Sequence, residues 1–223
     1  MTQRASAFDP STEPASAAAG RLGVHRPANL ARTVFHVGSG ALAMTLLRTL
    51  PSRGWLIAAA ASFAVFAWTC EIARRRSAAV NERLMRFFGP VAHAHEWHRV
   101  NSATWYATAL VLMALVVPMP ASEIGVLVLA LADPMAGFVG RRFGRRRLAS
   151  GRSLEGSLAF AATAFGVAIG WMTLTGSYAS SRFAVAAVAA TVGALVELFV
   201  SSVDDNLAVP LATSVAVAVA SLT

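Results

Sequence analysis

The sequence predicts an all-α protein, a polytopic membrane bundle of about seven transmembrane helices. Of its 223 residues, 56% are hydrophobic and only 13% are charged, and the mean hydropathy is +0.58. Apolar runs long enough to cross a bilayer recur from residue 30 onward. The arginines collect between these runs, where the cytoplasmic loops of membrane proteins carry their positive charge.

Residues 1–27 differ from the rest of the chain. They are rich in alanine and serine, and they lack the apolar stretch of a secretory signal peptide. They predict a disordered cytoplasmic tail, followed by a single transmembrane domain over residues 28–223. The apolar runs of that domain predict spans at residues 30–50, 55–70, 103–120, 122–140, 156–175, 183–203 and 206–222.

The loops give these spans an orientation. The connections around residues 71–99 and 141–152 are rich in arginine, whereas residues 118–123 contain none. The positive-inside rule therefore places the N-terminus and both arginine-rich loops in the cytoplasm. The polar connection at 204–206 faces the same side, so acids and arginines from distant parts of the chain are expected to meet there. We expect a multi-pass protein of a bacterial-type inner membrane, with its site facing the cytoplasm.

The composition also excludes several kinds of site. All 19 basic residues are arginines, so the lysine of a Walker-type phosphate loop is missing. The net charge of +8 comes from arginines between apolar runs, which indicates membrane topology rather than a nucleic-acid partner. Because Cys70 is the one cysteine, neither a disulfide framework nor a cysteine metal site can form.

One segment, residues 133–156, combines features that suit a ligand. On a helix, five residues with small or acidic side chains share one stripe: Asp133, Ala136, Gly137, Gly140 and Gly144. Six arginines follow: Arg141, Arg142, Arg145, Arg146, Arg147 and Arg152. An acid, a bare helix face and guanidinium groups together suit a polyphosphate that carries a metal ion. The alternative is a tightly packed membrane helix followed by an ordinary positive loop.

Asp133 lies within its predicted span, where an ionisable group costs about 2.5–3.5 kcal/mol. Together with Pro134 it forms a helix-start signal, with the aspartate as N-cap and the proline at the first helical position. A helix broken here would point its positive dipole end into a cavity. A proline kink with a paired carboxylate is the alternative.

A second polar group of residues lies between the last two predicted spans. Glu197, Ser201 and Asp204 share one helical stripe, and Asp205 and Asn206 follow at the turn. Carboxylates and an amide are hard oxygen ligands of the kind that Mg²⁺ prefers. For this segment taken alone, a polar turn that caps the last helix is the preferred explanation.

Three further segments give weaker signals. The spacing of His93, His95 and His98 does not favour a zinc site, because the first two do not share a helical face and no cysteine lies near. Glu96, Asn101 and Thr104 are expected as polar groups at the mouth of a cavity. The segment 71–76, EIARRR, is interpreted as a solvated end of the second span, although Glu71 could reach the site. Arg32 and His36 suit phosphate contact, proton acceptance or orientation anchoring.

Four segments carry a family resemblance: RTVFH at 32–36, HEWHRVNSATWY at 95–106, DPMAGFVGRRFG…GRSLEG at 133–156 and VELFVSSVDDNLAVP at 196–210. They resemble the CTP-dependent lipid-alcohol kinases, which include dolichol kinase, phytol kinase and the yeast-type diacylglycerol kinase. The third segment is similar to the CTP-binding pattern of that family at Asp133, Ala136, Gly140, Gly144, Arg152, Ser153, Glu155 and Gly156. Arg152 replaces the usual lysine, which keeps the charge but exchanges a point donor for a planar fork.

The resemblance implies transfer of the γ-phosphate of CTP to the hydroxyl of a lipid alcohol (polyprenol or dolichol, phytol, or diacylglycerol), with Mg²⁺ as cofactor. It implies catalytic roles for Asp133, Glu155, Glu197 and Asp204, and metal binding by Asp133, Asp204 and Asp205. The implied nucleotide-binding residues are Ala136, Gly140, Arg141, Arg142, Gly144, Arg145, Arg152, Ser153, Gly156 and Asn206. The implied substrate-binding residues are Arg32, His36, Glu96 and Asn101. No nucleic acid is expected as a partner, and a homodimer is left open.

Two other functions stay open at this point. A cytidylyltransferase that forms a CDP-lipid would share the nucleotide and the membrane. A small ion-coupled transporter would also use acids within the membrane and a broken helix. The transporter is disfavoured because it has no evident use for six arginines beside a glycine stripe.

Overall fold

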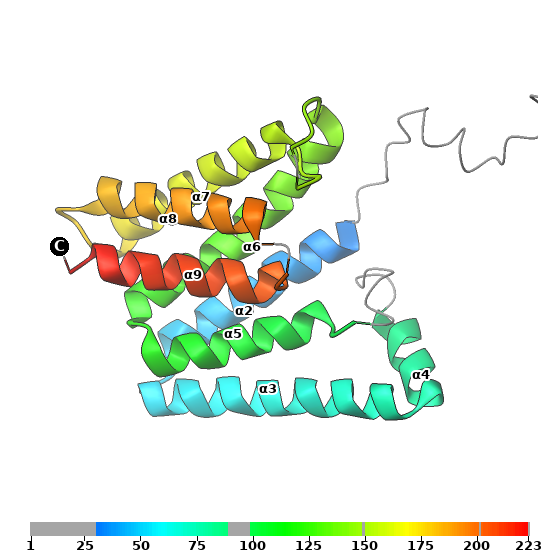
Figure 1. The fold of residues 1–223 in the computed structure, drawn as a ribbon. Coiled ribbons are helices and arrows are strands. Elements are labelled where there is room, and N and C mark those ends of the chain that lie inside the picture. The colour runs from blue at the N-terminus through cyan, green and yellow to red at the C-terminus, as the bar shows by residue number, and fades with distance from the viewer. Residues whose placement is uncertain (1–29, 89–98, 149, 201, 223) are drawn as a thin grey trace, which may run out of the picture.

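The computed structural model describes residues 30–88, 99–148, 150–200 and 202–222 of the chain, and every regular element in those residues is a helix (Figure 1). The helices are α2 (Leu30–Thr49), α3 (Arg53–Arg76), α4 (Ala78–Phe88), α5 (Ser102–Val116), α6 (Met119–Phe143), α7 (Leu154–Thr175), α8 (Arg182–Phe199) and α9 (Asp205–Ala220). The all-α prediction is therefore confirmed for the described part of the chain. The predicted tail at 1–27 lies outside it.

Four of these helices, α3, α6, α7 and α8, are long and apolar enough to cross a membrane. They support the prediction of a membrane protein. α5 and α9 are apolar but shorter, and α2 is interrupted by polar and charged side chains. A helix occupies each of the seven predicted spans, but the number of crossings and their orientation stay predictions.

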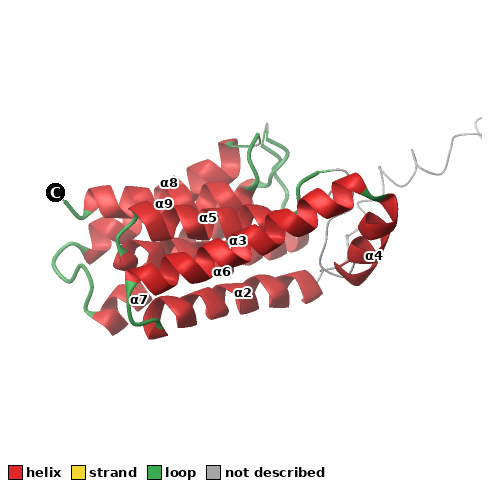
Figure 2. Ribbon diagram, turned by 90° about the horizontal axis from the view of Figure 1, so that it is seen from below, coloured by secondary structure: helices red, strands yellow, loops and turns green. Residues whose placement is uncertain are grey.

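The long helices run alternately in opposite directions, and α6 lies at the centre of the bundle (Figure 1). α6 packs against α2, α7 and α9, while α5 joins α3 to α9. The connections are short except the one from α3 to α5, which contains α4, and short connections favour this up-and-down order. Figure 2 shows the order from below, with α4 beyond the end of α3. As a result α3, α6 and α8 end, and α5, α7 and α9 begin, at the same end of the bundle. We call this the pocket end.

Two expectations about helix boundaries are wrong. α6 continues through Asp133 and Pro134, so the predicted helix start at this pair does not exist. A proline removes one backbone hydrogen bond, and the close packing of α6 against three neighbours holds the remaining turns in place. α3 continues past Cys70 to Arg76, and its charged end is only partly solvated: Glu71 and Arg74 are buried, whereas Arg75 and Arg76 are exposed.

Small residues let the central helices approach one another closely. A β-carbon added to Gly125 of α6 would lie 2.5 Å from the Pro210 carbonyl oxygen and 2.9 Å from the Ser214 β-carbon, both in α9. A β-carbon on Gly40 of α2 would lie 2.3 Å from the Ala130 β-carbon of α6. These contacts are tighter than any side chain would permit, so glycine is required at both positions.

Replacing Gly125 with alanine is expected to destabilise the protein by about 1–3 kcal/mol, because the clash is with backbone and α9 must move away. The measurement is thermal unfolding of the detergent-solubilised protein. Gly166→Ala on α7 is the matched control, since no atom lies within 4 Å of its added β-carbon. That variant is expected to be neutral or slightly more stable. Equal melting temperatures for the two variants would contradict the α6–α9 packing.

Candidate functional site

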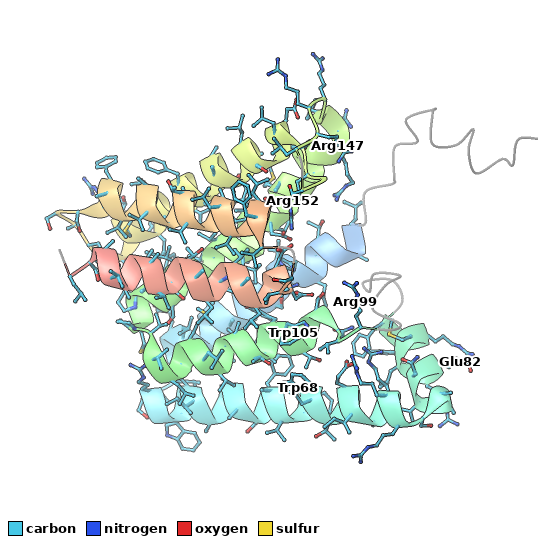
Figure 3. All side chains as sticks on the ribbon, viewed as in Figure 1. Trp68, Glu82, Arg99, Trp105, Arg147 and Arg152 are labelled. Carbon is cyan, nitrogen blue, oxygen red and sulfur yellow. The ribbon has the colours of Figure 1, made fainter. Side chains whose placement is uncertain are left out.

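A cavity of about 580 Å³ opens at the pocket end, and seven charged side chains of the described residues line it. Four are acidic (Asp133, Glu197, Asp204 and Asp205) and three are basic (Arg75, Arg99 and Arg152). They come from α3, α6, α8, α9 and the segments that precede α5 and α7. Figure 3 shows Arg99 and Arg152 on opposite sides of this region. Residues separated by more than a hundred positions in sequence thus share one polar cavity.

A tight hairpin between α6 and α7 places Arg152 in the cavity. The Leu148 amide donates to the Arg152 carbonyl at 2.8 Å, and the Leu154 amide donates to the Arg146 carbonyl at 2.9 Å. Gly151 turns the chain with a φ of 81°, in the left-handed region that glycine adopts without strain. The hairpin directs the Arg152 side chain toward the ends of α8 and α9.

Arg152 is held between two carboxylates. Its guanidinium donates to Glu197 Oε1 and, at 2.6 Å, to Asp205 Oδ2. Burial by itself lowers the pKa of the Arg152 guanidinium, but the Asp205 and Glu197 carboxylates more than offset this and raise the pKa above its ordinary value. Glu197 is only 3% exposed, so Arg152 also supplies the counter-charge that lets a carboxylate lie inside the bundle.

Asp204 caps α9 and joins it to α5. Its Oδ1 accepts from the Asn206 amide at 3.0 Å and from Asn206 Nδ2 at 2.8 Å, and its Oδ2 accepts from Ser102 Oγ at 3.0 Å. The capping turn considered from the sequence is therefore present. The cap does not exclude a role in ligand binding, because Asp204, Asp205 and Asn206 all line the cavity.

Asp133 reaches the cavity from within α6. Its Oδ2 lies 3.7 Å from His36 Nε2 of α2, and its side chain is 26% exposed. His36 of α2 is therefore the neighbour of the Asp133 carboxylate, a contact that the sequence analysis did not predict. Arg32 also lies in α2, and Asn101 caps the start of α5 by accepting from the Ala103 amide at 2.8 Å. Glu96, His93, His95 and His98 lie outside the described residues.

The glycine stripe was expected to face a ligand, but in the structure it packs against the start of α7. An added β-carbon on Gly140 would lie 2.8 Å from Ser153 Oγ, and one on Gly156 would lie 2.9 Å from the Ala136 carbonyl. An added β-carbon on Gly144 would also lie 2.8 Å from the Ser153 β-carbon. These residues thus form the close contact between α6 and the start of α7, where Ser153 Oγ accepts from the Gly156 amide at 3.1 Å. None of them lines the cavity in the described part of the chain.

The arginines of the α6–α7 connection divide into two groups. Arg152 points into the cavity, whereas Arg141, Arg142 and Arg145 are exposed and do not line it. Figure 3 shows Arg147 on the outer part of the hairpin. Glu155 also lies outside the cavity lining, and its carboxylate accepts from the Arg146 amide at 3.3 Å. Glu155 therefore stabilises the hairpin from outside.

Metal binding was predicted for Asp133, Asp204 and Asp205. All three line one cavity, but within the described ranges no group of three or more His, Cys, Asp or Glu side chains is close enough to hold a metal ion. Asp205 is engaged by Arg152, and Asp204 by the α9 cap. Protein carboxylates therefore do not form a closed cation cage, although carboxylate oxygens remain suitable for a magnesium ion that also binds phosphate.

Several residues of the cavity were not assigned to the site from the sequence. They are Arg75, Arg99, Ser102, Trp105, Ser150 and Ser202. Arg99, Ser102 and Trp105 lie in the resembling segment 95–106, and the other three lie in connections that the charge distribution places together. Trp105 packs edge-to-face on Trp68 of α3, with ring centroids 5.9 Å apart, which fixes the aromatic wall of the cavity (Figure 3).

Comparisons of the chain with protein-family models, curated proteins and solved structures gave no match. The geometry of the site and the resemblance of its motifs are therefore the basis for a functional assignment.

Proposed function

We propose that this chain is an integral-membrane kinase that transfers the γ-phosphate of CTP to the hydroxyl of a lipid alcohol. The observation that carries the proposal is the shared cavity: Asp133, Arg152 and the 204–206 turn, which belong to separate motifs, line the same space. The nucleotide and the acceptor class rest on the resemblance of these motifs to CTP-dependent lipid-alcohol kinases.

The charges of the cavity favour a metal-bound triphosphate over a free one. Four carboxylates and three guanidinium groups line it. A free triphosphate would be repelled by the carboxylates, whereas a triphosphate with Mg²⁺ offers anionic oxygens to the arginines and a cation to the acids. Asp133 and Asp205 would hold the ion together with phosphate oxygens, a donor set that suits Mg²⁺. The ion would neutralise charge on the phosphates.

Arg152 would exchange partners when the nucleotide binds. In the structure its guanidinium is bonded to Asp205 and Glu197. A phosphate in the cavity would take one of these bonds, and Asp205 would then become available to the metal ion. Such an exchange keeps every buried charge paired before and after binding, which is the condition for charges in a low-dielectric site.

The reaction requires positioning more than covalent chemistry. The lipid hydroxyl oxygen would attack the γ-phosphorus, the bond to the bridging oxygen of the β-phosphate would break, and CDP would leave. Asp133, paired with His36, and Glu197 line the cavity and are the available acceptors for the hydroxyl proton. Arg75, Arg99 and Arg152 would stabilise the charge on the transferring phosphate and on CDP.

The membrane arrangement is part of the proposal. The pocket end would face the cytoplasm, where CTP is present, with seven crossings and a cytoplasmic N-terminus in a bacterial-type inner membrane. This orientation follows from the arginine-rich connections at that end of the bundle. The lipid alcohol would enter sideways from the bilayer and place its hydroxyl in the cavity.

Labelled CTP tests this function. The purified protein in phospholipid nanodiscs is incubated with Mg²⁺, a mixture of phytol, polyprenol and diacylglycerol, and CTP labelled at the α- or the γ-phosphorus. Label from γ-CTP alone is expected in the lipid fraction, and mass spectrometry identifies the phosphorylated alcohol. Label from α-CTP would instead identify a cytidylyltransferase. No transfer of either label, with solute flux in liposomes, would indicate a transporter.

A further inference from the structure

A second charged cluster lies next to the cavity, at the junction of α3, α4 and α5, and the proposed reaction gives no direct role to its two buried members, Glu71 and Arg74. Its centre is Glu71, which is 2% exposed. The Glu71 carboxylate accepts from Arg74 Nε at 2.8 Å and from Arg74 Nη2 at 2.9 Å, a bidentate pair. It also accepts from Arg75 Nε at 2.6 Å and from the Asn101 amide at 3.2 Å. One buried carboxylate thus binds two neighbouring guanidinium groups and the backbone in front of α5.

The cluster is connected to both cavity arginines of this side. Arg75, which lines the cavity, is bonded directly to Glu71. Arg99, which also lines it, is held through its carbonyl oxygen, which accepts from Arg74 Nη2. Arg74 further donates to Asn81 Oδ1 of α4 at 3.0 Å, so the cluster is anchored on three elements. Arg152, the third cavity arginine, comes from the opposite side and has no contact with this cluster among the bonds of the described residues.

We propose that Glu71 is a positioning residue that holds Arg75 and Arg99 at the cavity for the phosphates of the nucleotide. An arginine side chain on a helix end has many rotamers, and ordering it on phosphate binding costs free energy. Glu71 already fixes the Arg75 side chain and, through Arg74, the backbone of Arg99. Part of the ordering has therefore taken place in the free protein and does not weaken phosphate binding. This inference rests on the proposed function, since it assumes that the cavity takes a metal-bound triphosphate.

The test measures equilibrium binding of CTP, in the presence of Mg²⁺, to the full chain in nanodiscs for wild type, Glu71→Gln, Arg75→Met and the double variant. Glu71→Gln keeps the shape of the side chain but removes its charge. It is expected to raise the Kd for CTP about tenfold, equivalent to about 1.4 kcal/mol. The loss of CTP-binding free energy in the double variant is expected to be smaller than the sum of the losses in the two single variants, because Glu71 acts partly through Arg75.

The chain offers a matched control for this experiment. Glu82 and Arg86 of α4 form an ion pair of the same i, i+4 spacing at 2.6 Å, but both side chains are exposed and neither lines the cavity. Glu82→Gln is expected to leave the Kd for CTP unchanged. Glu71→Asp, which keeps the charge, serves if Glu71→Gln does not fold, and it is expected to weaken binding less than Arg75→Met does.

The outcomes separate this inference from the proposed function. If the wild type binds CTP and Glu71→Gln (or Glu71→Asp, where that variant replaces it) binds it equally tightly, the positioning role is wrong and the kinase proposal is unaffected. Fully additive losses in the double variant would also overturn the positioning role, because they would show that Glu71 acts independently of Arg75. If the wild type binds no CTP, both proposals fall.

Discussion

Arg152→Met is expected to abolish lipid phosphorylation and to destabilise the protein by about 3–5 kcal/mol. The substitution removes the guanidinium that pairs with Glu197 and Asp205, and it leaves the 3%-exposed Glu197 as an uncompensated buried charge. It also removes one of the three cations of the cavity. The measurements are the γ-phosphate transfer rate at saturating CTP and the melting temperature in detergent.

A second substitution separates the two effects of Arg152. In Arg152→Met/Glu197→Gln the buried charge is removed together with its partner, so most of the lost stability is expected to return. Transfer activity is expected to stay absent, because the phosphate-binding cation is still missing and Glu197, one of the two proposed proton acceptors, has been replaced as well. Arg147→Met is the matched control, since Arg147 lies in the same hairpin but is exposed and outside the cavity. Recovered activity in the double variant would exclude a phosphate-binding role for Arg152.

The positions of the helices could be predicted from the sequence because apolar length is a local property. The predicted spans at 156–175 and 206–222 correspond to α7 (Leu154–Thr175) and α9 (Asp205–Ala220) within two residues at each end. The end of α3 could not be predicted in this way. Charged residues normally mark the end of a span, but a bidentate Glu71–Arg74 pair compensates the buried charge and lets the helix continue.

The sequence could predict that the motifs meet at one end of the bundle. It could not predict which arginine side chains line the cavity there. Alternating helices bring every second connection to the same end of the bundle, so the 133, 152 and 204 regions were expected to meet. Which guanidinium groups enter the cavity depends on side-chain directions set by local geometry. The hairpin at Gly151 turns Arg152 inward, and the buried Glu71 directs Arg75 toward the cavity, while Arg141 and Arg142 stay exposed.

The glycine stripe shows that a helix face without side chains can be interpreted in two ways. A surface without side chains admits a ligand or another helix equally well. In the structure the second helix is present: Gly140 faces Ser153, and Gly156 faces the Ala136 carbonyl. The stripe thereby fixes the start of α7 and the hairpin before it, which in turn places Arg152. The glycines therefore act on the cavity through packing, a role that spacing in the sequence does not distinguish from direct contact.

The end of the bundle opposite the cavity contains an ion pair between a half-exposed arginine and a buried carboxylate, whose loss should affect stability alone. Arg48 Nη2 of α2 donates to Glu123 Oε2 of α6 at 2.8 Å, Arg48 Nε lies 2.7 Å from Glu123 Oε1, and Trp171 Nε1 of α7 donates to the same carboxylate at 2.8 Å. The Arg48 guanidinium also lies 5.0 Å from the Trp171 ring centroid. This pair joins α2 to α6, the helix on which α2 packs.

Arg48→Met is expected to cost about 3–5 kcal/mol, since Glu123, whose side chain is 6% exposed, would keep its charge with only Trp171 as a partner. A melting temperature lower by about 10 °C is the corresponding result in detergent. The KM for CTP is expected to be unchanged in the folded fraction, because Arg48 does not line the cavity.

Arg53→Met is the control at the same end of the bundle. Among the described residues, Arg53 donates to the carbonyl oxygens of Ala114, at 2.9 Å, and Val117, at 3.3 Å. Both acceptors are uncharged, so the loss of Arg53 is expected to cost about 1–2 kcal/mol. Arg48→Met/Glu123→Gln should recover much of the stability that Arg48→Met loses. If instead Arg48→Met raised the KM for CTP as strongly as Arg75→Met does, the two ends of the bundle would be coupled, and the stability of α2 could not be treated as independent of the cavity.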